Sequence, residues 1–159
     1  FEIETSKAIG IQLIRHRSFS FQEFSQRYQD VNRLGDIFEP IELREQCEDN
    51  RQSSTEVFDP VIKTYATTNA SEVINSLLGN IKSTYMRLLE AGVAREQARM
   101  ILPMTTKTKI FMTGSIRSWI HFLNLRDDEH AQKEIQLVAK EAKEIFKQQL
   151  PIISNALNY

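Results

Sequence analysis

The stretch TTKTKIFMTGSIRSWIHFLNL, residues 105–125, decides the fold because it joins a strand-like segment directly to a helix-like one. Residues 105–113 are rich in Thr, Ile and Phe, which favour strands. Gly114 and Ser115 then turn the chain, and apolar residues recur at helical spacing as far as about Leu125. We therefore predict a strand followed at once by a helix. The apolar face of that helix is predicted to hold Ile116, Trp119, Ile120 and Leu123.

The first residues of the chain predict one strand and one short helix. Apolar or neutral residues alternate with glutamates from Phe1 to Thr5, as in a strand. Residues 7–17 are typical of a helix with Ile11 and Ile14 on one face. A strand needs partners, and this one begins at the first residue, so we expect an N-terminal segment to be missing.

The next part of the chain has weaker patterns. Residues 19–30 are polar and aromatic without a clear period. Residues 35–69 contain two prolines and a polar run over residues 48–54. We predict a loop with short elements there, and loops of this length often have a function.

Three more helices are predicted. Asn69 as N-cap and Gly92 as terminator bound the first. The second begins at Ala94 and ends before Pro103, which cannot continue it. Residues 127–129 are acidic and suit the positive N-terminal end of the third helix dipole. The buried stripe of the third helix is predicted to hold Ala131, Ile135, Val138, Ala142 and Ile145.

The composition is that of one globular domain over residues 1–159, with 41% hydrophobic and 26% charged residues. The elements above predict an α+β, helix-dominated fold with a small β-sheet. A net charge of −1 argues against a nucleic-acid partner. No apolar run approaches the roughly 18 residues that span a membrane, so we expect no membrane association and a cytoplasmic location.

Residues 15–28, RHRSFSFQEFSQRY, combine three arginines, one histidine, one glutamate and three serines. The planar guanidinium group of arginine matches phosphate geometry. The alternative is a purely structural role, namely a solvated basic helix end with Ser20 and Glu23 forming only a capping box. The density of these residues favours an anion site, most simply for phosphate.

A second group comprises Arg99 and the helix after Ser115. Arg117 and His121 lie four residues apart and therefore share a helix face. Arg126 ends this helix, where a cation is also favoured by the helix dipole alone. Arg126 is therefore either part of a binding site or only a helix-end cation, and both interpretations stay open.

Other chemistries have less support. His16, His121 and His130 lack metal-ligand spacing, so no metal site is predicted. There is no glycine-rich phosphate loop, and the single cysteine, Cys47, has no neighbouring base.

Residues 15–28 resemble the signature Arg-His-Arg-x-x-Ser-x-x-x-x-Ser-x-Arg-Tyr of the flavin-dependent thymidylate synthases, and every fixed residue is present. Gln22 is a departure, since the family usually has Asn there. A second stretch of the chain is similar to the family at a set of separate matches: Ala98-Arg99, Leu102-Pro103, Thr113-Gly114-Ser115, Arg117-Ser118, Leu125-Arg126, Ala131-Gln132 and Glu134-Ile135.

This resemblance implies a ThyX-like fold that assembles as a homotetramer with active sites shared between chains. It implies the reductive methylation of dUMP to dTMP, with methylenetetrahydrofolate as carbon donor and FAD reduced by NADPH as hydride source. No cysteine nucleophile is implied.

The resemblance also implies the site residues, with Arg126 as the catalytic residue that ionises the uracil ring. Implied FAD contacts are Arg15, His16, Arg17 and Glu23 from one chain, and Ser115, Ile116, Arg117 and His121 from another. Implied dUMP contacts are Gln12, Leu13, Ile14, Arg15, Glu23, Phe24, Ser25, Gln26, Arg27, Arg99 and Arg126.

Two other functions use the same arginines. One is a non-catalytic nucleotide- or RNA-binding module, against which the near-neutral charge argues. The other is a flavoprotein of different activity on a similar scaffold.

Overall fold

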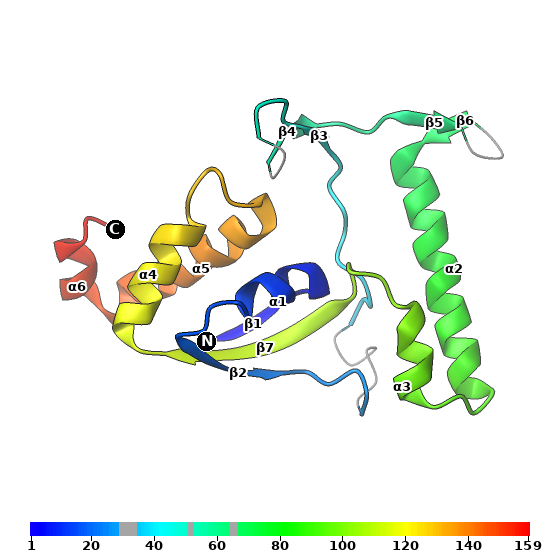
Figure 1. Ribbon diagram of the computed structural model, residues 1–159, viewed down its shortest axis with the longest axis horizontal. Coiled ribbons are helices and arrows are strands. Elements are labelled where there is room, and N and C mark those ends of the chain that lie inside the picture. The colour runs from blue at the N-terminus through cyan, green and yellow to red at the C-terminus, as the bar shows by residue number, and fades with distance from the viewer. Residues whose placement is uncertain (29–34, 51–52, 64–66) are drawn as a thin grey trace.

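The protein contains a three-stranded antiparallel sheet in the order β1–β7–β2 (Figure 1). The computed structural model describes residues 1–28, 35–50, 53–63 and 67–159. The strands are β1 (Glu2–Ser6), β2 (Phe19–Glu23) and β7 (Lys107–Gly114). Helices pack against this sheet, and the predicted α+β class is confirmed.

The central strand β7 and its partner β1 confirm two predictions. Ile3 lies opposite Ile110 in the antiparallel register, and both are buried. The polar neighbours of Ile3 point to the other side, where Lys109 pairs with Glu2 and Glu4. The alternation in the sequence therefore reports one buried face and one solvated face.

Strand β2 was not predicted, because its sequence has no clean alternation. It forms by pairing with β7, and Phe19 lies opposite Gly114. Residues 29–30 of the polar segment, and residues 51–52 of the polar run, lie outside the described residues.

Helix α1 (Lys7–Leu13) corrects both the length and the face of the predicted helix. Its buried residues are Ile9, Gly10 and Leu13, whereas Ile11 and Ile14 are 39% and 44% exposed. The contact with the sheet, and not the spacing of isoleucines, selects the buried face. Because the helix ends at Leu13 and not at Arg17, residues 15–17 lie in the turn that leads into β2.

Helix α4 (Ile116–Arg126) follows β7 as predicted. Trp119, Phe122 and Leu123 are buried, and Phe19 packs against Trp119 with ring centroids 4.9 Å apart. Ile116, the first residue of the predicted apolar face, is 44% exposed at the start of the helix.

Helix α5 (Lys133–Gln149) begins later than predicted. Residues 127–129 are not its first turn: Asp127 accepts a hydrogen bond from Lys143, 2.7 Å away. Its buried stripe includes Phe146 in place of Ile145, which is 46% exposed. The short helix α6 (Pro151–Ala156) follows and also contacts the core.

The remaining elements stand beside the sheet (Figure 1). Helix α2 (Ala70–Glu90) is followed by α3 (Arg95–Ala98) and the 3₁₀ turn η2 (Arg99–Ile101). The first of the predicted helices is confirmed, with Asn69 at the N-cap position and Gly92 in the left-handed region at φ 84°. The helix predicted from Ala94 is only one short α-helix followed by a 3₁₀ turn.

The segment before α2 contains two small hairpins, which confirms the prediction of short elements in this region. They are β3 (Arg44–Gln46) with β4 (Ser54–Val57), and β5 (Val61–Lys63) with β6 (Thr67–Asn69). In the part of the chain that the structure describes, no helix combines the length and apolar character needed to cross a membrane.

Candidate active site

A hydrogen bond between two side chains joins the two arginine-rich regions of the sequence. Arg126 Nε donates to His16 Nε2 at 3.0 Å, although the two residues are 110 positions apart. The turn after α1 supplies His16, and the last turn of α4 supplies Arg126. The pairing of β2 with β7 brings these two elements together, since β2 follows the turn and β7 precedes α4.

His16 is buried against aromatic rings. Its ring lies edge-on to Phe122, with centroids 5.0 Å apart. Burial, the positive charge of Arg126 and the neighbouring His121 lower the pKa of His16 to about 4. At neutral pH the imidazole is therefore uncharged, and Nε2 accepts the hydrogen bond from Arg126 while Nδ1 carries the proton.

Arg126 is partly buried at the same place. Burial first, and then the charge of Arg15, lower the pKa of Arg126 from its ordinary value. A guanidinium group nevertheless stays protonated in proteins. The site thus holds a fixed positive charge next to a second arginine. This arrangement favours the binding of an anion or of a ring that can lose a proton.

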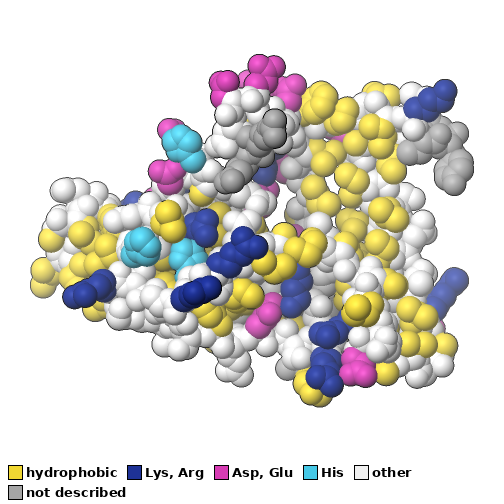
Figure 2. All heavy atoms as spheres, viewed as in Figure 1, with side chains coloured by type: hydrophobic (Ala, Val, Ile, Leu, Met, Phe, Trp, Pro, Cys, Tyr) yellow, Lys and Arg dark blue, Asp and Glu magenta, His cyan; other side chains and the backbone are white. Residues whose placement is uncertain are grey.

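The arginines around this point have no carboxylate partners in the part of the chain that the structure describes. Arg15, Arg17 and Arg117 are exposed and form no ion pair with any described residue, whereas Arg27 and Arg44 each pair with glutamates. Figure 2 shows Lys, Arg and His side chains gathered on the viewed face beside α1 and α4. Unpaired guanidinium groups of this kind suit phosphate.

The start of α4 has a structural role as well. Ser115 is the N-cap and accepts a hydrogen bond from the Ser118 amide at 3.2 Å. The Ser118 hydroxyl donates to the Ser18 carbonyl at 3.3 Å, which ties α4 to the turn that carries the arginines. Ile116 and Arg117 are exposed in the first turn of the helix, beside this link.

Glu23 ends β2 and is held by two donors. Lys7 Nζ lies 2.7 Å and Thr108 Oγ1 lies 2.8 Å from its Oε1. Neither Lys7 nor Thr108 was singled out from the sequence. No local sequence pattern points to Thr108, because it meets Glu23 only through the position of β7 next to the end of β2.

A second group of expected dUMP contacts lies beside α3. Arg27 Nε is 3.1 Å from Glu96 of α3, and Phe24 packs against the small core formed there by Ile37, Tyr85 and Ala98. The main-chain oxygen of Ser25 accepts a bond from the Tyr28 amide. The chain therefore passes from the sheet to α3 through the segment from Phe24 to Arg27.

Two buried donors in this second group lack partners among the described residues: Gln26 Nε2 and Arg99 Nε. An unsatisfied buried polar group costs about 1–3 kcal/mol. Water, a ligand or another chain can complete the bonding of such groups. Both residues are among the expected dUMP contacts, and both can donate to an anionic nucleotide.

The end of α1 carries the last expected contacts. Leu13 is fully buried, so only its main chain is available to a ligand, whereas Ile14 is exposed. Gln12 Nε2 donates to Gln132 Oε1 at 2.6 Å. The only sequence signal for Gln132 was its place in the second stretch that resembles the family.

Two hollows of about 460 Å³ each flank Arg44 and the start of α5. Neither of these two hollows is lined by Arg15, His16 or Arg126. Among the described residues, no three His, Cys, Asp or Glu side chains converge on a possible metal ion.

The α+β fold thus brings a neutral histidine and several arginines together in one cationic cluster, which suits phosphate. The family model described as "Thymidylate synthase complementing protein" matches residues 1–152. A flavin-dependent thymidylate synthase from Synechocystis sp. is 40% identical over 99% of this chain and 70% of the relative. A probable one from Paramecium bursaria Chlorella virus 1 shows the same values, and one from Thermosipho africanus is 37% identical over 95% of this chain and 64% of its own length. The chain belongs to the flavin-dependent thymidylate synthases, a family of methyltransferase enzymes.

Proposed function

We propose that this chain converts dUMP to dTMP by reductive methylation, with methylenetetrahydrofolate as carbon donor. FAD, reduced by NADPH, would supply the hydride. The observation that carries the proposal is the meeting of Arg126 with His16, because it joins the two separate stretches that resemble the family in one cationic cluster.

The residues around the cluster fit the diphosphate of FAD. Unpaired guanidinium groups come from the turn after α1 and from the start of α4. We assign FAD contacts to Arg15, His16, Arg17 and Glu23 on one chain, and to Ser115, Ile116, Arg117 and His121 on a neighbouring chain.

The dUMP site would draw on three parts of the chain. Arg99 Nε and Gln26 Nε2 are buried donors that need partners, and they can bind the nucleotide phosphate. Arg126 would face the pyrimidine ring. The full set of dUMP contacts is Gln12, Leu13 (through its main chain), Ile14, Arg15, Glu23, Phe24, Ser25, Gln26, Arg27, Arg99 and Arg126.

Arg126 is the group we assign to activation of uracil. Its Nε is occupied by His16, which fixes the guanidinium plane and leaves the two terminal nitrogens for the ligand. A fixed positive charge beside N3 and its neighbouring carbonyl favours the ionised ring. Neutral His16 can accept from Arg126 without adding a second charge.

Cys47 has no part in this proposal. It lies half-buried between β3 and β4, where its amide donates to the Ser53 carbonyl, and not on the elements that carry His16 and Arg126. The ring is activated by charge in place of a protein thiolate.

We also propose a homotetramer with shared sites, and two features support it. Arg15, Arg17 and Arg117 are exposed on this chain, so a neighbouring chain can add contacts to a ligand bound there. Helix α2 buries only Ala70 and Tyr85, Leu77 is 56% exposed, and Figure 2 shows hydrophobic side chains along α2. Apolar side chains that a helix leaves uncovered are typical of a protein interface.

The test is substitution of Arg126 in the FAD-loaded protein. Loss of a preorganised charge-stabilising donor costs about 100- to 1,000-fold in turnover, so we expect this loss for Arg126→Ala. Arg126→Lys should be intermediate, because lysine keeps the charge without the planar fork. dTMP formation, flavin content and thermal stability are measured together.

Lys147, in the last turn of α5, is a matched helix-end cation. Lys147→Ala should lower stability by at most about 1 kcal/mol and leave turnover unchanged. If Arg126→Ala behaves like Lys147→Ala, Arg126 is only a helix-end cation and the proposed mechanism is wrong.

A further inference from the structure

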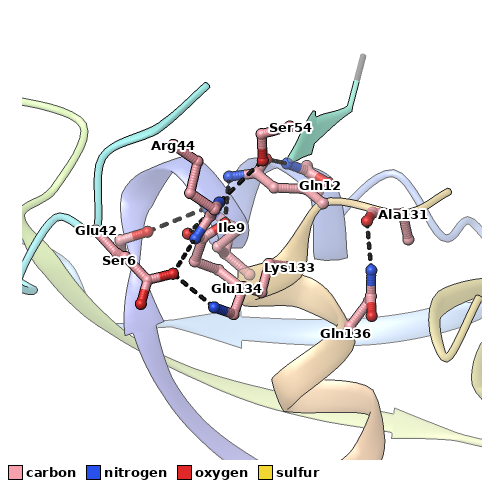
Figure 3. Close-up of polar contacts among 11 residues, drawn as sticks. Ser6, Ile9, Gln12, Glu42, Arg44, Ser54, Ala131, Lys133, Glu134 and Gln136 are labelled. Atoms are coloured by element: carbon pink, nitrogen blue, oxygen red, sulfur yellow. Dashed lines mark hydrogen bonds and ion pairs between the residues drawn. The ribbon is translucent and has the colours of Figure 1, made fainter. Parts of the chain in front are cut away.

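A series of hydrogen bonds links hairpin β3–β4 to the end of α1 through the start of α5. An Arg44 terminal nitrogen donates to Glu134 Oε1 at 2.5 Å, and Gln132 Nε2 donates to Glu134 Oε2 at 2.8 Å. Gln12 Nε2 then donates to Gln132 Oε1 at 2.6 Å. Figure 3 shows Gln12, Arg44 and Glu134 close together in this network.

The chemistry of the groups gives this series a direction. A guanidinium only donates hydrogen bonds, and a carboxylate only accepts them. Gln132 must therefore turn its NH₂ group to Glu134 and its carbonyl oxygen to Gln12. Gln12 must in turn donate with its own NH₂ group, so its Oε1 is the end left for a ligand.

The series starts from a well-fixed ion pair. The Arg44 side chain is only 10% exposed and also donates to Glu42 at 3.0 Å and to Ser54 at 2.9 Å. Burial alone would raise the pKa of Glu134, but its hydrogen bonds, first of all from Arg44, lower it overall. Glu134 is therefore an anion at neutral pH and accepts from both neighbours.

We propose that Gln132, oriented by Glu134 and Arg44, is a positioning residue that presents Gln12 Oε1 to the nucleotide as a hydrogen-bond acceptor. This inference rests on the proposed function, which places Gln12 in the dUMP site. The group that Gln12 takes must then be a donor. dUMP offers the ring N3–H and the 3′-hydroxyl, and only the hydroxyl remains when the ring is ionised beside Arg126.

The test is dUMP binding to the FAD-loaded protein by isothermal titration calorimetry, with three variants. In Gln132→Met the Gln12 side chain is no longer held by a hydrogen bond. Because dUMP must then order this side chain when it binds, the affinity for dUMP should fall about 2- to 10-fold. Gln132→Lys is a donor only, so it reverses the amide of Gln12 and should weaken binding at least as much. Gln136→Lys is the matched control, because Gln136 Nε2 donates to the Ala131 carbonyl at 2.7 Å and does not bond to Gln12.

The dUMP affinities of the two lysine variants, compared with each other, test the role of Gln132. Both add the same positive charge near an anionic ligand, so charge alone predicts equal or tighter binding for both. We expect Gln136→Lys to bind dUMP at least as tightly as the unchanged protein and Gln132→Lys to bind it more weakly. Equal affinities for the two overturn the inference, as does a loss of thermal stability in the Gln132 variants with no loss of affinity.

Two further readouts separate this inference from the proposed function. A protein that neither binds dUMP nor forms dTMP overturns both. A protein that does both, with all three variants unchanged, overturns only the role of Gln132. The 2′,3′-dideoxy analogue of dUMP should bind the unchanged protein about 5- to 30-fold more weakly than dUMP does. The Gln132→Lys variant should bind this analogue with almost the same affinity as the unchanged protein. Equal binding of dUMP and the analogue by the unchanged protein overturns the assignment to the 3′-hydroxyl.

Discussion

Acid should destabilise this protein through His16. Its pKa is about 4 in the folded chain, against an ordinary value of 6.5. Between these values the unfolded chain takes up a proton that the folded chain does not. The stability that the neutral His16 contributes is therefore fully present above pH 6.5 and is lost as the pH drops towards 4.

The size of this effect follows from the pKa difference. At 1.36 kcal/mol per pKa unit, the shift from 6.5 to about 4 corresponds to at most about 3.4 kcal/mol. Solvent around the partly exposed Arg126 and His121 screens the repulsion, so we expect roughly 1–3 kcal/mol. Urea unfolding at several pH values and one protein concentration measures it, with the buried Trp119 as the only tryptophan reporter.

His16→Gln is the informative variant. Glutamine can accept the bond from Arg126 but cannot titrate, so the loss of stability between pH 6.5 and 4 should become shallower. His130→Gln is the control: Asp128 raises the pKa of His130, so its contribution is present at low pH and is lost as the pH rises. If His16→Gln and the unchanged protein lose stability in parallel, His16 is not the buried neutral group described here.

Two further substitutions test the chemistry and the packing. Cys47→Ser should leave dTMP formation within about twofold, because no basic cluster activates the thiol; a loss of orders of magnitude in a folded variant would make Cys47 the nucleophile. Gly114→Ala should cost about 1–3 kcal/mol in thermal unfolding, because a Cβ there would lie 2.4 Å from the Phe19 ring. Gly79 lies in the middle of α2, and apart from its chain neighbours and the backbone of its own helix no atom of the described chain lies within 4 Å of a Cβ added there. Gly79→Ala should therefore stabilise by about 0.5–1 kcal/mol; equal effects of the two glycine substitutions would contradict this packing.

The local sequence predicted the elements whose signals lie within a few residues. The alternation from Phe1 to Thr5 gives β1, the turn at Gly114 separates β7 from α4, and Gly92 ends the α2 region. The signature in residues 15–28 was also sufficient to identify the family, since it is a matter of residue type and spacing alone. Such patterns depend on backbone preferences and short-range bonds, which are written in the order of the residues.

The tertiary structure decided which faces are buried and which distant residues meet. Strand β2 exists because β7 pairs with it, and α1 buries Ile9 in place of Ile11 because the sheet lies on that side. The bond from Arg126 to His16 and that from Gln12 to Gln132 each join residues more than a hundred positions apart. Such contacts depend on how whole elements pack, and packing is set by the shapes and partners of many side chains at once, which no local pattern encodes.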